Sequence, residues 1–70
     1  MKYAIVIEHE GNAWGAYIPD LPGCIATGKN EVEVRRCIQE ALAIHLKSMK
    51  EDGDEIPEPS TQVEYAIADF

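Results

Sequence analysis

The chain has 70 residues, of which 46% are hydrophobic and 27% are charged, and its formal net charge at pH 7 is −7. A chain this short buries only about 60% of the surface that it exposes when unfolded, which allows one small core and excludes two. No apolar run approaches the roughly 20 residues that span a bilayer, and no signal-peptide pattern opens the chain, so we expect a cytoplasmic protein. The negative charge repels nucleic-acid phosphates and disfavours direct binding of DNA or RNA.

The charge is unevenly distributed along the chain. Residues 1–50 carry six acidic and six basic residues, whereas residues 51–70 carry seven acidic residues and no basic one. All of the net charge therefore lies in the last twenty residues. Such a segment either keeps the protein solvated or forms a surface that meets a basic partner.

Three short strands are expected in the first 28 residues. Residues 2–8 are rich in β-branched and aromatic side chains, and the turn-forming Gly11 and Asn12 separate them from a second strand over residues 13–18. A loop with two prolines and a glycine then precedes a short third strand that runs from Cys24 to Thr27 or Gly28.

A helix is expected to follow Asn30, which has the character of an N-cap, with Glu33 at the third helical position in a variant of the capping box. Gly53 is expected to end it. Apolar or half-apolar residues recur at a spacing of three and four and make one continuous stripe: Val34, Cys37, Ile38, Ala41, Leu42, His45, Leu46 and Met49.

The alternation of Val63, Tyr65 and Ile67 predicts a last strand after the proline-containing residues 54–60. Short turns join the first three strands into an antiparallel meander, and a right-handed crossover through the helix places the last strand beside the first. The predicted fold is therefore α+β, in the order β-β-β-α-β, with one helix on one face of a four-stranded mixed sheet of order 3-2-1-4.

One helix covers only one face of such a sheet, yet the first two strands carry apolar or small residues on both faces. A second face without charge is exposed unless a partner or another copy covers it. We therefore expect a homo-oligomer, a dimer or a tetramer, and the residues expected at its contact are Tyr3, Ile5, Trp14 and Tyr17.

The residues that could carry chemistry do not form a recognisable site. Cys24 and Cys37 lack the paired spacing of a zinc site and are interpreted as small buried residues. His9 is a turn histidine between acids, and His45 lies on the helix stripe without a ligand at suitable spacing. No nucleophile with its base and no phosphate-binding glycine motif is recognisable. The sequence predicts no enzymatic activity, no cofactor and no metal.

The sequence resembles the HicB antitoxin family along nearly its whole length. The most specific segment runs from Ile18 to Cys24, with the sequence I-P-D-L-P-G-C. Four shorter patterns support it: Tyr3-x-Ile5-x-Ile7, Ala26-x-Gly28, Glu40-Ala41-Leu42 and Ile56-Pro57-x-Pro59-Ser60. The resemblance implies a partial ribonuclease H-like fold and a type II antitoxin that binds and covers a small basic HicA-like toxin, which cleaves mRNA.

Many members of that family carry a C-terminal helix-turn-helix or ribbon-helix-helix segment that binds the operator. Because this chain ends at Phe70, we expect a single HicB-like domain over residues 1–70 without a DNA-binding segment. The residues expected to contact the toxin are the acids Glu55, Glu58, Glu64 and Asp69.

Two alternatives stay open at this point. An orphan regulatory module would have kept the fold and lost its toxin, and a neighbouring reading frame for a small basic protein would argue against it. An active nuclease would need several carboxylates to hold two metal ions, and Glu8 and Asp20 are the only acids at strand ends.

Overall fold

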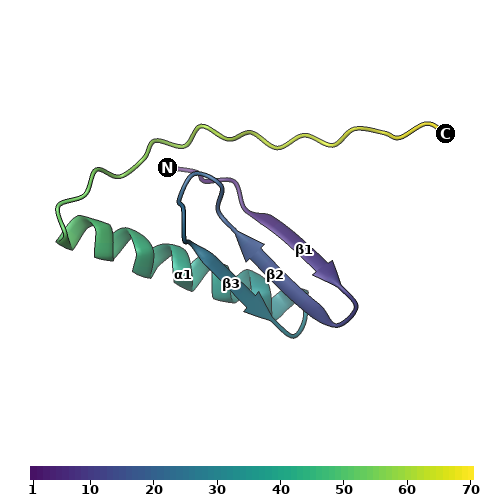
Figure 1. Cartoon of the computed structure of the whole chain (residues 1–70), viewed down its shortest axis with the longest axis horizontal. Helices are drawn as coiled ribbons and strands as arrows, with labels where there is room; N and C mark the ends of the chain where they lie inside the picture. Colours follow the sequence, from purple (N-terminus) through teal and green to yellow (C-terminus); the bar gives the residue numbers. More distant parts are fainter.

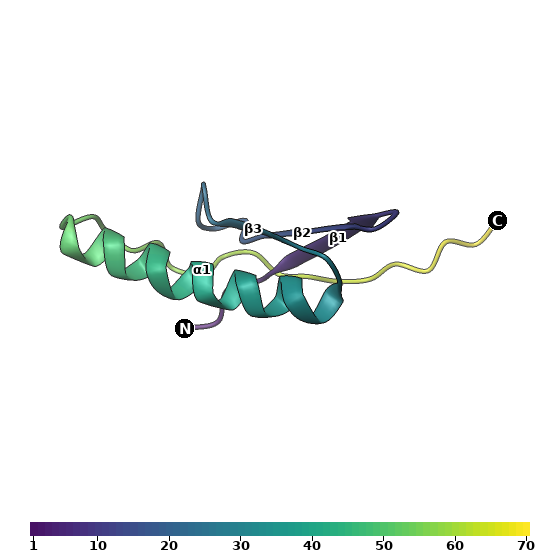
Figure 2. The ribbon, with the colours of Figure 1, turned by 90° about the horizontal axis from the view of Figure 1, so that it is seen from below.

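The computed structural model describes all 70 residues, as a three-stranded sheet with one helix and a long extended C-terminal segment (Figure 1). Strands β1 (Val6–Glu10), β2 (Ala13–Tyr17) and β3 (Ile25–Gly28) form an antiparallel sheet of order β1-β2-β3. Helix α1 (Glu31–Glu51) lies along one face of that sheet (Figure 2). The predicted α+β class, the three-stranded meander and the single helix are confirmed.

β1 and β2 form a hairpin with a two-residue turn. Gly11 and Asn12 lie between the paired residues Glu10 and Ala13. Gly11 has a φ of 60° and Asn12 has no positive φ, as in a type II′ turn, which suits the twist of a hairpin. Strand alternation then directs three apolar residues of the hairpin toward the core: Ile7, Trp14 and Ala16.

α1 begins and ends where the sequence predicts. Oδ1 of Asn30 accepts a hydrogen bond from the backbone N–H of Glu33 at 2.8 Å. The Glu33 carboxylate accepts from the N–H of Lys29 at 3.2 Å, so the return bond of the capping box reaches one residue beyond the cap. At the other end, Gly53 has a φ of 75° and its N–H donates to the carbonyl of Lys50. The predicted cap and stop are confirmed.

We expect Asn30→Ala to lower the free energy of unfolding by about 1 kcal/mol, because the N–H of Glu33 loses its acceptor. In a domain of this size the melting temperature should fall by about 4–8 °C. Thermal unfolding followed by circular dichroism measures the change, with Gln62→Ala in the exposed C-terminal segment as the control. Equal melting temperatures for the two variants would contradict the cap.

The core is small and lies between α1 and the middle of the sheet. Its six buried side chains are Ala16, Ile18, Leu21, Cys24, Val34 and Ile38. Val34 and Ile38 are completely buried, with 0% of their surface exposed. Every residue of the predicted helix stripe is buried or half-buried. The predicted core-facing side of the helix is therefore confirmed.

The loop between β2 and β3 contributes half of this core. The N–H of Ile18 donates to the carbonyl of Cys24 at 3.1 Å, and the N–H groups of Leu21 and Cys24 donate to the carbonyls of Ile18 and Leu21 at 3.0 Å. These bonds fold the loop so that three side chains spaced by three residues point inward. The segment that carries most of the family resemblance is thus a structural element.

The end of β3 touches the start of the helix at Gly28. A Cβ built at this position would lie 2.7 Å from the backbone nitrogen of Val34. No side chain fits in that space, so the glycine permits the close approach of strand and helix. This approach helps to bury Val34 completely.

The predicted fourth strand is wrong for the single chain. Residues 54–61, here called the connector, and residues 62–70, here called the tail, are extended but pair with no strand. Pairing requires backbones about 4.8 Å apart, and the tail diverges from β1 along its length (Figure 1). A parallel ladder on one edge is also weak per residue. The main contacts of α1 with the sheet are to β2 and β3, so the helix would stabilise a fourth strand beside β1 only weakly.

The face of the sheet that points away from α1, here called the open face, carries apolar residues as predicted but also carries charge. Val6 pairs with Tyr17, and Tyr17 pairs with Ile25, which makes one apolar row across all three strands. Tyr17 is 40% exposed and Ile25 68% exposed. However, Glu8 and Glu10 lie two and four residues after Val6 and share its face, because side chains alternate along a strand. The expectation of a face without charge is therefore wrong at Glu8 and Glu10.

Candidate partner-binding surface

The connector is fixed to the sheet by Asp20, in the loop after β2. One carboxylate oxygen of Asp20 accepts hydrogen bonds from the backbone N–H groups of Ser60 and Thr61, at 2.9 and 3.1 Å. The other accepts from the hydroxyl of Thr61 at 2.7 Å and from that of Ser60 at 3.1 Å. These four bonds, here called the Asp20 clamp, join residues 40 and 41 positions apart in the chain.

The Asp20 clamp stabilises the ionised carboxylate. The Thr61 hydroxyl, followed by the two backbone N–H groups, lowers the pKa of Asp20 from 3.8 to about 2. The sequence offers Asp20 only as one of two acids at strand ends. Its oxygens instead hold the connector.

The lowered pKa predicts how stability depends on pH. Because the folded pKa lies below the unfolded one, the clamp's contribution is fully present above about pH 4 and is lost as the pH falls toward 2. We expect the wild type to be more stable than Asp20→Asn at pH 6, and the difference to shrink as the pH falls to 2. Urea unfolding of both proteins at several pH values measures it. A difference that does not depend on pH would contradict the clamp.

A second contact fixes the connector near the start of β1. The hydroxyl of Tyr3 donates to the carbonyl of Pro57 at 2.6 Å. Ile56, Pro57 and Pro59 are half-buried, whereas every residue of the tail is exposed. The chain is therefore held up to Thr61 and projects freely beyond it.

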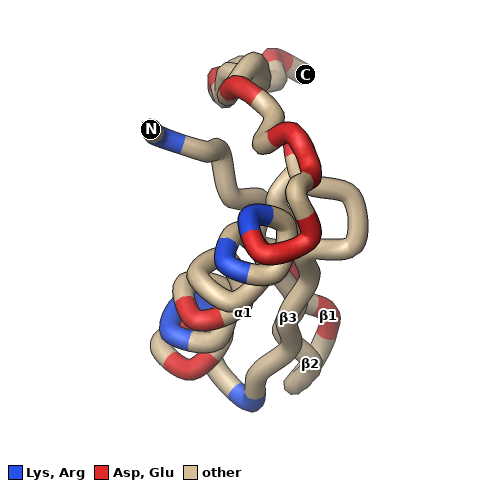
Figure 3. Tube along the Cα trace, turned by 90° about the vertical axis from the view of Figure 1, so that its left-hand side faces the viewer, with Lys and Arg blue, Asp and Glu red and all other residues tan.

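The four acids predicted to contact a toxin, Glu55, Glu58, Glu64 and Asp69, are all exposed, on the connector and the tail. The single ion pair of the structure joins Arg35 to Glu31 at 2.9 Å within α1, so none of the four is neutralised internally. Figure 3 shows acidic residues along the C-terminal segment and basic residues mainly along the helix. The four carboxylates are thus available to an external cation.

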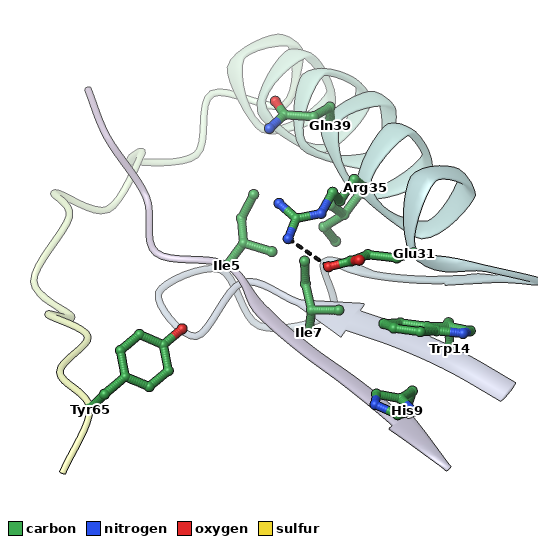
Figure 4. Close-up of a pocket in the computed structure, with 9 residues that line it drawn as sticks. Ile5, Ile7, His9, Trp14, Glu31, Arg35, Gln39 and Tyr65 are labelled. Atoms are coloured by element: carbon green, nitrogen blue, oxygen red, sulfur yellow. Dashed lines mark hydrogen bonds and ion pairs between the residues drawn. The ribbon is translucent and has the colours of Figure 1, made fainter. Parts of the chain in front are cut away.

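A groove of about 720 Å³ runs between β1 and α1 (Figure 4). Ile5 and Ile7 line it from the β1 side, and Arg35 and Gln39 line it from the helix, above the buried Ile38. At one end the rings of His9 and Trp14 stack with centroids 4.3 Å apart and an interplanar angle of 19°. Tyr65 of the tail borders the groove and points toward β1.

The four residues predicted at an oligomer contact do not form one surface. Ile5 and Trp14 line the groove on the helix side of the sheet. Tyr17 lies on the open face with Ile25, and Tyr3 is half-buried with its hydroxyl on Pro57. The structure therefore offers two separate apolar surfaces, in agreement with strand alternation, which places Trp14 and Tyr17 on opposite faces of β2.

The fold brings together no group of three or more His, Cys, Asp or Glu side chains that could hold a metal ion. Cys24 is buried, and burial raises the pKa of its thiol, while Cys37 is half-buried. Neither forms a disulfide. α1, the one helix, falls short of the length of apolar sequence that a membrane crossing requires.

Fold and surface together define a small α+β domain with exposed apolar and acidic surfaces of the kind that bind other proteins. Residues 3–69 match the profile of the family described as HicB_like antitoxin of bacterial toxin-antitoxin system. This chain belongs to the HicB-like antitoxin family.

Two relatives illustrate this membership. Antitoxin HicB 2 of Photorhabdus laumondii is 34% identical over 64 residues, which cover 91% of this chain and 46% of that protein. An uncharacterized 14.9 kDa protein in the rep-hol intergenic region of Haemophilus phage HP1 is 32% identical over 65 residues, which cover 93% and 49%. The chain thus spans about half the length of these relatives.

The structure is also similar to a solved one. A chain of the HicA3 and HicB3 toxin-antitoxin complex superposes with a TM-score of 0.72 at 27% sequence identity. The superposition covers 86% of this chain and 70% of that chain. The family resemblance inferred from the sequence is confirmed.

Proposed function

We propose that this protein is a type II antitoxin that binds a HicA-like toxin and covers its RNA-binding and catalytic surface. The observation that carries the proposal is the similarity to a chain of the HicA3 and HicB3 toxin-antitoxin complex. The mechanism is occlusion, and the protein itself catalyses no reaction. Because the target of such a toxin is mRNA, the proposal places the pair in the cytoplasm.

The surface that we assign to the toxin is the acidic C-terminal segment. Glu55, Glu58, Glu64 and Asp69 are exposed and lack an internal cation, which supports their assignment to a basic partner. The Asp20 clamp and the bond between Tyr3 and Pro57 hold the connector acids at a defined place on the domain. A preorganised charged segment loses less conformational entropy on binding than a free one.

The proposal also includes a homo-oligomer, a dimer or a tetramer. It is supported by the apolar row of Val6, Tyr17 and Ile25 on the open face and by the exposed apolar residues of the tail. Large exposed apolar residues of this kind are typical of contact surfaces.

Co-expression tests the function. Cells that make a HicA-like toxin encoded beside this chain should resume growth when this protein is made, and purified protein should stop RNA cleavage by the toxin. The comparison is with Ile38→Ala, which disrupts the core and should not rescue. Failure of a folded wild-type protein to rescue growth would refute the proposal, as would cleavage of RNA by this protein alone with a divalent metal.

A further inference from the structure

The central strand of the sheet contains a glycine that the fold does not require. Trp14 and Ala16 pack toward the core, so strand alternation directs position 15 to the open face. A Cβ built on Gly15 would meet only the carbonyl oxygen of Ala26, at 3.9 Å, which is an ordinary contact. Three of the other four glycines have a positive φ, and Gly28 touches the helix. Gly15 alone has neither reason to be a glycine.

Gly15 leaves a notch in the middle of the open face. In the register of the three strands it lies between Glu8 and Thr27, which form the walls of the notch. A glycine inside a strand weakens the strand, because the unfolded chain gains conformational freedom and no side chain packs on the neighbours. In sheets, such a glycine often occurs where a ligand or another backbone approaches closely. The notch is therefore a place of close approach.

Two hollows of different chemistry lie on either side of the middle of the open face. The first has a volume of about 320 Å³ and is lined by Glu8, His9, Glu10, Ala13, Trp14 and Gly15. The second has a volume of about 400 Å³ and lies at the loop after β2, where Tyr17, Pro22 and Ile25 are among its lining residues. Tyr17 and Ile25 belong to the apolar row, so this row leads from the acidic hollow to the apolar one.

The charge of the open face indicates which partner covers it. Glu8 and Glu10 project from this face, and the strands β1, β2 and β3 contain no lysine or arginine. A second copy stacked on the open face would add its own two acids to the same interface, and like charges brought together there oppose association. A basic side chain of a different protein would instead pair with these acids. The open face therefore fits a basic partner better than a second copy.

We propose that the open face binds a basic side chain of the toxin. An arginine or lysine lies across Gly15 with its aliphatic stem in the notch and its charged end at the Glu8 carboxylate, and an adjacent apolar side chain fills the hollow at Tyr17 and Ile25. This inference rests on the proposed function and deepens it, because it adds a docking surface to the acidic C-terminal segment. The apolar row then contacts the toxin, and the exposed apolar residues of the tail remain as support for the homo-oligomer.

The two surfaces act on different steps of binding. The acids of the connector and tail are exposed, and charges of this kind act mainly on the rate of encounter. A charge pair and an apolar contact that become buried in the docked complex act mainly on the dissociation rate. Changes on the open face should therefore speed dissociation and leave the association rate nearly unchanged.

Gly15→Val tests the notch by filling it. The fold has room for the added side chain and valine favours strands, so the melting temperature should not fall. We expect the complex with the toxin encoded beside this chain to dissociate about tenfold faster or more, as measured by surface-binding kinetics. Ile25→Ser, at a position that is 68% exposed, removes the apolar contact and should act in the same direction. The control is Ala43→Leu, which enlarges an exposed residue of α1 across the sheet from the open face and should leave both rates unchanged (Figure 2).

The outcomes separate this inference from the proposed function. A wild type that does not bind the toxin overturns both. A wild type that binds, with Gly15→Val and Ile25→Ser dissociating at the wild-type rate, overturns the inference alone. Variants that lose self-association in light scattering but hold the toxin as the wild type does assign the open face to a second copy, which also overturns it. A lower melting temperature of Gly15→Val would show that the fold itself requires the glycine, and it would contradict the notch.

Discussion

Replacing Ile38 by alanine should lower the free energy of unfolding by about 2–5 kcal/mol. Ile38 is completely buried on the face of α1 that contacts β2 and β3, and truncation leaves a cavity that so small a core cannot fill. A domain is stable by about 5–15 kcal/mol in total, so this loss removes a large share of it. Urea unfolding monitored by Trp14 fluorescence measures the change.

Ile44→Ala is the matched control for this prediction. Ile44 is the same residue type on the same helix, but it is 69% exposed and lies outside the core. Its truncation should change the free energy of unfolding by less than about 0.5 kcal/mol. If the two variants unfold at the same urea concentration, the packing of the helix on the sheet described above is incorrect.

The helix could be predicted closely because its signals are local. The cap at Asn30, the stop at Gly53 and the apolar stripe all lie within the segment that they define. The meander was likewise predictable from alternation and from Gly11. The motif from Ile18 to Cys24 supports the resemblance to the family. Its packing into the core depends on backbone hydrogen bonds within the loop, which a sequence pattern does not predict.

The last strand was mispredicted because alternation shows that a segment can form a strand but does not show with which edge it pairs. The path of the tail is set where Asp20 binds Ser60 and Thr61, about 40 residues later in the chain. Nothing in a single sequence links residues so far apart. The groove was not predicted either, because its lining residues come from β1 and the first half of α1, which are far apart in the sequence.

The exposure of the four acids was predictable in outline, because all of the net charge lies in residues 51–70. Their freedom from internal ion pairs was not, since six basic residues precede them in the chain. Arg35 pairs with Glu31, and none of the other basic residues lies within ion-pair distance of the C-terminal carboxylates. Strand alternation places Ile5 and Tyr17 on opposite faces of the sheet, but it does not show which face a partner covers.

Changing Glu55, Glu58 and Glu64 to glutamine and Asp69 to asparagine should slow association with a HicA-like toxin by about tenfold or more at low salt. The change reduces the net charge from −7 to −3 and removes it from the segment assigned to the toxin. Charge steering acts mainly on the association rate and is screened beyond a Debye length of about 8 Å at physiological salt. The wild-type rate should therefore fall with salt, while the dissociation rate changes less.

Stopped-flow or surface-binding kinetics at several salt concentrations measures both rates. The control changes Glu8, Glu10 and Glu40 to glutamine, which reduces the net charge to −4 at exposed positions outside the connector and tail. All seven substituted residues are exposed, so the melting temperature should change little in either variant. If charge placement matters, the control associates faster than the four-residue variant despite its similar net charge. Equal association rates for the two variants would show that net charge alone guides the encounter, and an unchanged rate in both would remove electrostatic steering from the mechanism.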